Sequence, residues 1–157
     1  MSSKVIGALL LTMTLVFAAN AADGEAEAIA KEGAKSFARC SGFWDVMSDV
    51  EMAADNRASA EMMGNLSNGA RTAALHLFAI AALEGGDAMQ RPYAYWMPLV
   101  EPHRETSALR IWALNEKGLM DDIKIEAELC QALLPMQEEF INEIRESSLG
   151  TRATDSP

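Results

Sequence analysis

The stretch from Ala38 to Glu51 (ARCSGFWDVMSDVE) holds one of the two cysteines of the chain beside two bulky aromatic residues. Cys40, Trp44 and Met47 follow one another at steps of four and three residues. Apolar residues at this spacing share one face of an α-helix. The pattern continues on both sides of the stretch, and it predicts one long helix from about 25 to 55 with Cys40 facing the core.

The second cysteine, Cys130, lies on the apolar stripe of another predicted helix, from about 121 to 147. Neither cysteine belongs to a Cys-x-x-Cys redox motif or to a cluster with zinc-ligand spacing. In an oxidising compartment two such cysteines usually pair with each other. We therefore expect a structural disulfide between Cys40 and Cys130 that joins two long helices.

The N-terminal residues have the layout of a secretory signal peptide. A short positive segment ending at Lys4 precedes an apolar run from Val5 to Ala18, and Ala19-Asn20-Ala21 supplies the small-x-small pattern of a cleavage site. The apolar run is shorter than the roughly 20 residues that a membrane-spanning helix needs. The sequence therefore predicts a signal peptide over 1–21 and a periplasmic or secreted protein, with a retained N-terminal anchor as the alternative.

The charge balance limits the kinds of partner that the protein can have. The chain of 157 residues carries a formal net charge of −10, and loss of Lys4 with the signal peptide makes it more negative. Such a chain repels phosphate backbones and anionic membrane surfaces, so neither nucleic acid nor membrane insertion after cleavage is expected. A basic protein is the partner that this charge favours, and the oligomeric state is left open.

The remaining pattern is helical throughout and shows no strand alternation. A second helical region covers about 57 to 83, with turn chemistry in its middle at Gly64–Gly69 (GNLSNG) and an end at Gly85-Gly86. The last helix should kink at Pro135. We predict an all-α fold of four to five helices in a small bundle held by one disulfide. A single domain over 22–148 would precede a disordered tail over 149–157.

One segment differs in character from the rest. Pro92, Pro98 and Pro102 recur through it, and each should interrupt a regular helix. We expect an irregular segment lying across the bundle, followed by a helix that begins at Thr106 or Ser107.

The same segment is the best candidate for a binding surface, because aromatic residues are favoured at protein contacts. Its candidate residues are Tyr93, Tyr95, Trp96 and Met97. The alternative role is to cover the open side of the core. Asp45 and Asp49, one helical turn apart, form a second candidate, an acidic patch for a cation or a basic partner; otherwise they belong to a solvated face.

No motif in the chain identifies an enzyme, and no catalytic residue, metal ligand set or cofactor is predicted. His76 lies in a strongly apolar stretch and is expected to be a buried neutral imidazole bonded to a neighbour. His103 is expected to be a solvated loop residue. Thioether and imidazole groups suit Cu(I), so a copper site is an alternative. Its candidate methionines are Met47, Met52, Met62 and Met63.

Together these observations favour a small acidic binding or accessory module without catalytic activity, such as an inhibitor, an immunity protein, an adaptor or an assembly factor. The alternative is an enzyme or a metal-binding protein whose site involves His76, His103 or the methionines.

The predicted cleavage site gives a direct test. Ala19-Asn20-Ala21 is the only good small-x-small site after the apolar run, so the exported protein should begin at Ala22. Intact-mass spectrometry of the exported protein checks this. A mass that includes Met1 would support the retained anchor instead.

Overall fold

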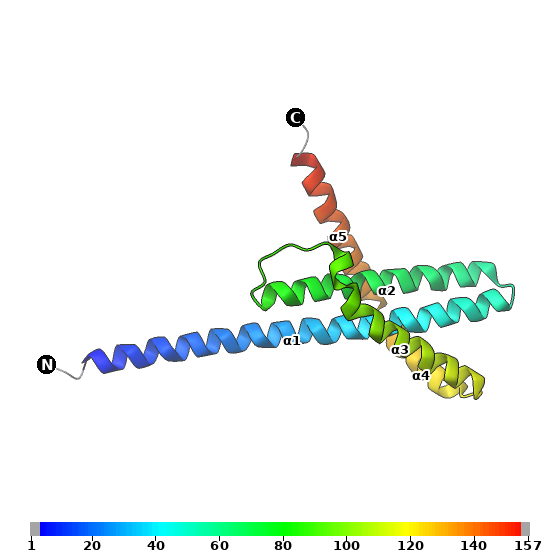
Figure 1. The fold of residues 1–157 in the computed structure, drawn as a ribbon, viewed down its shortest axis with the longest axis horizontal. Coiled ribbons are helices and arrows are strands. Elements are labelled where there is room, and N and C mark those ends of the chain that lie inside the picture. The colour runs from blue at the N-terminus through cyan, green and yellow to red at the C-terminus, as the bar shows by residue number, and fades with distance from the viewer. Residues whose placement is uncertain (1–3, 155–157) are drawn as a thin grey trace.

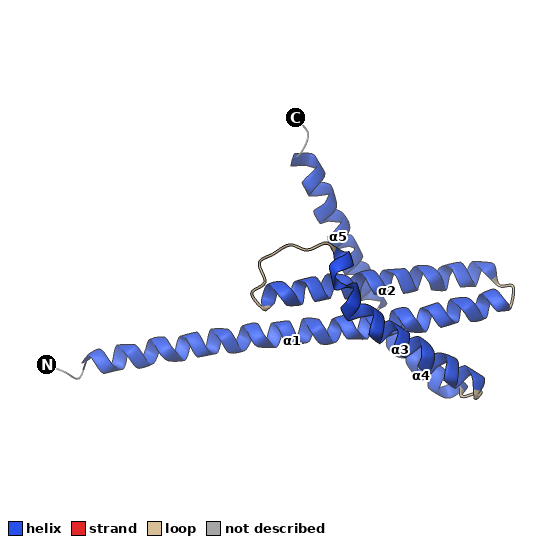
Figure 2. Cartoon of the chain, viewed as in Figure 1, coloured by secondary structure: helices blue, strands red, loops and turns tan. Residues whose placement is uncertain are grey.

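The computed structural model describes the backbone of residues 4–154 and the side chains of residues 24–147. Over this range the chain is helical and contains no strand (Figure 2). The elements are α1 (Lys4–Ala53), α2 (Arg57–Glu84), the 3-10 helix η1 (Tyr93–Trp96), α3 (Met97–Glu116), α4 (Met120–Ala132) and α5 (Leu134–Thr154). The predicted all-α class with four to five helices is therefore confirmed.

The helices form two hairpins that cross each other (Figure 1). The first consists of α1 and α2, which run antiparallel and share the most extensive packing in the molecule. The second consists of α3 and α4, joined at Gly118, whose φ of 67° is readily adopted only by glycine. It lies obliquely on the first hairpin, and α5 then leaves the crossing beside α2.

The core lies between the two long helices and beneath α3. On α1 the aromatic side chains of Phe37, Phe43 and Trp44 are buried, and Val100 and Ile111 of α3 pack against the same cluster. The facing side of α2 buries three alanines, Ala70, Ala73 and Ala74, together with Leu77 and Phe78. The alanines let the backbones of α1 and α2 approach closely between the larger side chains.

At the crossing, the backbone of α3 rests directly on α1 at Gly42. A Cβ added to Gly42 would lie 2.1 Å from the backbone oxygen of Arg104 and 3.1 Å from the backbone nitrogen of Ala108. Both neighbours are main-chain atoms of a helix, so they cannot move aside as a flexible side chain could. Gly42 therefore sets the distance between α1 and α3.

A network of charged and polar side chains surrounds this contact and connects three helices. Arg104 of α3 forms ion pairs with Asp45 of α1 and, at 2.9 Å, with Glu101. Glu101 also binds Arg71 of α2 at 2.6 Å. Ser67 of α2 donates a hydrogen bond of 2.5 Å to Asp45. These pairs fix the position of α3 along both helices of the first hairpin.

The predicted disulfide is present and joins Cys40 of α1 to Cys130 of α4, with an S–S distance of 2.06 Å. Both residues are buried, as their positions on apolar stripes predicted. The bond joins residues 90 positions apart, and on the chain-entropy model it stabilises the fold by about 4–5 kcal/mol. It holds the C-terminal end of α4 against the C-terminal half of α1.

The turn predicted at Gly64–Gly69 is wrong, because α2 continues through it without interruption. Tertiary contacts account for the residues that resembled a turn. Ser67 is buried against α1, and Gly69 lies under Gln137, whose Nε2 would be 2.2 Å from an added Cβ. The predicted end at Gly85 is correct.

The irregular proline segment is shorter than predicted. It comprises residues 85–92 and η1, whereas α3 begins at Met97 and contains both Pro98 and Pro102. Pro98 stands in the first turn, where a helix needs no backbone N–H. At Pro102 the helix continues without that N–H, and Thr106 donates its hydroxyl to the Pro102 carbonyl at 2.7 Å. The predicted helix start at Thr106 or Ser107 is therefore wrong.

Pro135 separates two helices, whereas the sequence predicted one kinked helix. α4 ends at Ala132 and α5 begins at Leu134, so Pro135 stands in the first turn of α5. The change of direction at this point carries α5 away from α4 and onto α2.

Two predicted segments lie outside the residues whose side chains are described: the signal peptide over 1–21 and the tail over 149–157. Both stay predictions. Within the described residues, no helix has the length and apolar character needed to cross a membrane.

The contact at Gly42 generates a stability prediction. Gly42→Ala should lower the free energy of unfolding by about 1–3 kcal/mol, because the added methyl group meets the backbone of α3. Urea unfolding followed by circular dichroism measures the change.

Gly64→Ala is the matched control, since Gly64 is also helical and its added Cβ would meet nothing closer than the Ser48 hydroxyl at 3.6 Å. That variant should gain up to about 1 kcal/mol from helix propensity. Equal gains at both positions would contradict the proposed close contact.

Candidate binding groove between α1, α3 and α4

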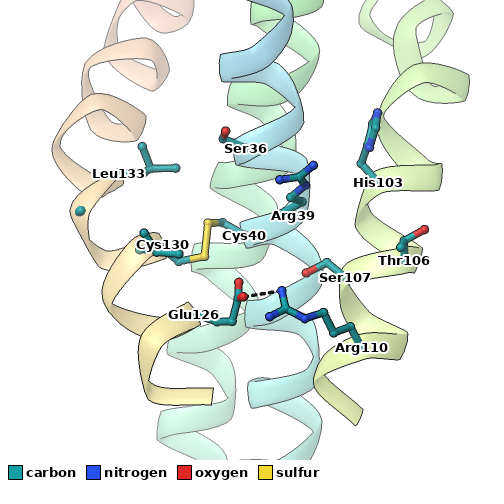
Figure 3. A pocket seen from close by; sticks show the side chains of 12 residues that line it. Ser36, Arg39, Cys40, His103, Thr106, Ser107, Arg110, Glu126, Cys130 and Leu133 are labelled. Atoms are coloured by element: carbon teal, nitrogen blue, oxygen red, sulfur yellow. Dashed lines mark ion pairs between the residues drawn. A yellow bond between two sulfur atoms is a disulfide. The ribbon is translucent and has the colours of Figure 1, made fainter. Parts of the chain in front are cut away.

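A cavity of about 600 Å³ opens where α3 and α4 diverge on either side of α1 (Figure 3). The two helices are held together near their shared turn by an ion pair between Arg110 of α3 and Glu126 of α4. On the side of this ion pair that faces away from the turn, α1 lies between α3 and α4. The Cys40–Cys130 disulfide, which links α1 to α4, lines the cavity. We call this cavity the groove.

The side of the groove formed by α1 and α3 is polar and cationic. Arg39 extends from α1 into the space beside α3, where His103 and Ser107 also line the groove (Figure 3). Within the described part of the chain, Arg39 and His103 have no ion pair or hydrogen bond through their side chains. Their donors are therefore available to a bound molecule.

The side formed by α4 is apolar. Leu129, Ala132 and Leu133 line it together with the two cysteine sulfurs. Leu129 is 59% exposed, so its side chain offers apolar area to a bound molecule. The groove thus has a charged wall and an apolar wall that face each other across α1.

The electrostatic character of the groove is opposite to that of the whole chain. Acidic residues outnumber lysine and arginine by 23 to 13 in the sequence, yet two arginines and one histidine line the groove against one acid, Glu126. That acid is already paired with Arg110. Outside the groove, the pKa of Glu32 is lowered chiefly by Lys35, with smaller contributions from the charges of Arg39 and His103. The groove is therefore a local positive region on an acidic protein.

The two histidines occupy different environments. His76 is largely buried, and its Nδ1 lies 2.9 Å from the Tyr93 hydroxyl, in the manner predicted for a buried imidazole bonded to a neighbour. Phe140 packs on the same ring. Burial, with a smaller effect from Glu143, raises the pKa of Tyr93 above its usual value of 10.0. His103, by contrast, stands on α3 in the wall of the groove, so its prediction as a loop residue is wrong.

The four residues of the candidate binding surface between Tyr93 and Met97 differ in how far they are buried. Trp96 is only 7% exposed and belongs to the core cluster, while Tyr93 is bonded to His76. Met97 is partly buried. Tyr95 is 52% exposed, with the guanidinium of Arg91 4.3 Å from its ring centroid. Only one of the four residues is thus freely presented to a partner, and a cation stands beside it.

Asp45 and Asp49, the two residues of the candidate acidic patch, differ in their contacts and in their exposure to solvent. Asp45 binds Arg104 and Ser67 inside the network at the helix crossing, whereas Asp49 is exposed. The charge of Asp45 is thus already compensated by Arg104.

The methionines proposed for copper lie near the closed end of the α1–α2 hairpin. Met47 and Met63 pack against the core, while Met52 and Met62 are exposed. In the described residues, no three side chains of histidine, cysteine, aspartate or glutamate gather in a possible metal site.

Sequence reasoning missed the groove, although part of it repeats at helical spacing. His103, Ser107 and Arg110 recur at steps of four and three residues, which places them on one face of α3. This face was hidden because a helix was expected to begin only at Thr106 or Ser107. Arg39 gave no comparable pattern, since its role depends on the approach of α3.

The different burial of two adjacent aromatic residues can be tested directly. Trp96→Ala should cost about 3–5 kcal/mol of stability, because it removes a buried ring from the core. Tyr95→Ala should cost less than about 1 kcal/mol, because that ring is half exposed and contacts mainly Arg91 and Trp96. Chemical denaturation of both variants checks the difference. Similar losses for the two would contradict this division of the segment.

The chain matches no protein-family model, no curated protein and no solved structure.

Proposed function

We propose that this protein is a secreted or periplasmic binding protein without catalytic activity, and that it holds a small organic ligand in the groove. The observation that carries the proposal is the cavity itself. Its volume of about 600 Å³ falls within the range of roughly 300–1,000 Å³ typical of ligand sites. Its walls combine apolar side chains with a few polar groups, among them the side chains of Arg39 and His103, which lack partners in the described chain.

The construction of the groove supports recognition of a ligand. Its polar groups stand on helices whose relative positions are fixed by the Gly42 contact, the Arg104 network and the disulfide. A site held in this way loses little conformational entropy when a ligand binds.

The alternative of an enzyme or a metal-binding protein has less support. Of the two histidines proposed for such a site, only His103 lies in the groove, and His76 is already bonded to Tyr93. The export of the protein fits the disulfide, since such bonds form and persist mainly in oxidising compartments. A basic protein partner stays a prediction that rests on the net charge of −10.

The test is to fill the groove. Ala132 lines it and is exposed, so Ala132→Trp should occupy the apolar wall while the protein stays folded. Nitrogen-15 NMR spectra of the wild-type protein, recorded with small-molecule extracts of the host cell, should show shifts at the amides of Ser36, Ser107 and Leu133. These shifts should be lost in the filled variant.

Ala58→Trp is the matched control, because Ala58 is also exposed and helical but lies on α2 away from the groove. It should bind as the wild-type protein does. Shifts that persist in Ala132→Trp, or the absence of any groove-centred shift with the extracts, would refute the proposed function.

A further inference from the structure

We infer that the ligand is an amphiphilic organic anion, with a carboxylate head held by Arg39 and His103 and an apolar chain lying along α4. The inference rests on the proposed function and adds the chemical class of the ligand. It follows from the separation of charged and apolar groups on opposite walls of the groove.

The head is assigned from the available donors. Arg39 presents a guanidinium fork that matches the two oxygens of a carboxylate, and His103 supplies a ring N–H on the neighbouring helix. Ser107 lines the same wall and is 9% exposed, so its hydroxyl is already shielded from bulk water. No side-chain hydrogen bond of Ser107 occurs in the described chain. Donors from two helices thus converge on a wall that can receive a negative group.

Arg110 has a different role. Its guanidinium is paired with Glu126, whose side chain is 17% exposed. This pair closes the narrow end of the groove and leaves little net charge there. The unpaired positive charge of the groove is therefore that of Arg39, which lies beside His103 at the wider end.

The chain is assigned from the opposite wall. The opposite wall is an apolar surface formed by the disulfide and by Leu129, Ala132 and Leu133. The one acidic side chain that lines the groove, Glu126, is paired with Arg110. A hydrocarbon chain laid there would remove the exposed side chain of Leu129 from water. A small inorganic anion would satisfy Arg39 and His103 but leave this wall uncovered, so the ligand needs both parts.

The acidity of the chain makes this assignment easy to test. With a net charge of −10, the overall field favours cationic ligands and repels anions. A preference for an anion over a cation of equal chain length can therefore arise only from local groups. Decanoate, decanol and decyltrimethylammonium form a matched series with negative, neutral and positive heads.

Titration calorimetry with each compound, below its micelle concentration, is the experiment. Decanoate should bind at least about tenfold more tightly than the other two, which corresponds to about 1.4 kcal/mol. Arg39→Gln and His103→Gln should each weaken decanoate binding by about tenfold and leave decanol binding unchanged. Arg57→Gln is the matched control, because Arg57 is exposed at the far turn of the α1–α2 hairpin, and it should bind decanoate normally.

The outcomes separate this inference from the proposed function. Equal affinity for decanol, or decanoate binding that is indifferent to Arg39→Gln and His103→Gln, would overturn the anionic head. If Ala132→Trp still abolishes the binding, the groove remains a ligand site. Failure of decanoate to bind at all also overturns the ligand class, whereas the proposed function is decided separately by the extract spectra.

Discussion

The structure depends on the contact between the backbones of α1 and α3 at Gly42. A side chain larger than hydrogen at this position would separate the two helices, because its Cβ would lie 2.1 Å from the Arg104 oxygen. The crossing places His103, Ser107 and Arg110 beside α1, where they meet Arg39 and Cys40. Without it there would be a helical hairpin and a loose second hairpin, but no groove between them.

The ion pairs around this contact specify its register more than they add to its stability. Partly buried ion pairs lose hydration energy that offsets most of their attraction, although removal of one partner leaves the other uncompensated. Arg104 shows both effects, since burial alone would lower its pKa while Asp45 and Glu101 together raise it above its usual value. A shift of α3 by one turn would break its ion pair with Asp45 of α1 and its ion pair with Arg71 of α2. The network therefore selects one arrangement of the two hairpins.

Sequence periodicity was sufficient for features that depend on one helix at a time. The step of three and four residues around Cys40 located the core face of α1, and the same reasoning placed Cys130 inward and paired the two. Periodicity failed where a contact with a residue distant in the sequence decides the local structure. Ser67 and Gly69 resemble turn residues, yet they serve close contacts with α1 and with Gln137 of α5.

Local rules failed for similar reasons in the proline segment and at the groove. Proline at 102 disfavours a helix, but packing of Val100 and Ile111 on α1 keeps α3 helical through it. The sequence left two roles open for Trp96, a binding surface or a cover over the core, and the structure places it in the core cluster. The groove requires residues from three helices, and no spacing within one of them could bring Arg39 next to His103.

The disulfide also gives the molecule a covalent topology that its helices alone do not reveal. Residues 40–130 form a closed ring that contains α2, η1, α3 and most of α4. The loop over residues 85–92, mostly exposed, lies within this ring. A single protease cut in that loop would open the ring without dividing the protein, because both fragments stay joined through the sulfurs. The bond thus keeps the groove-forming helices attached even in a nicked molecule.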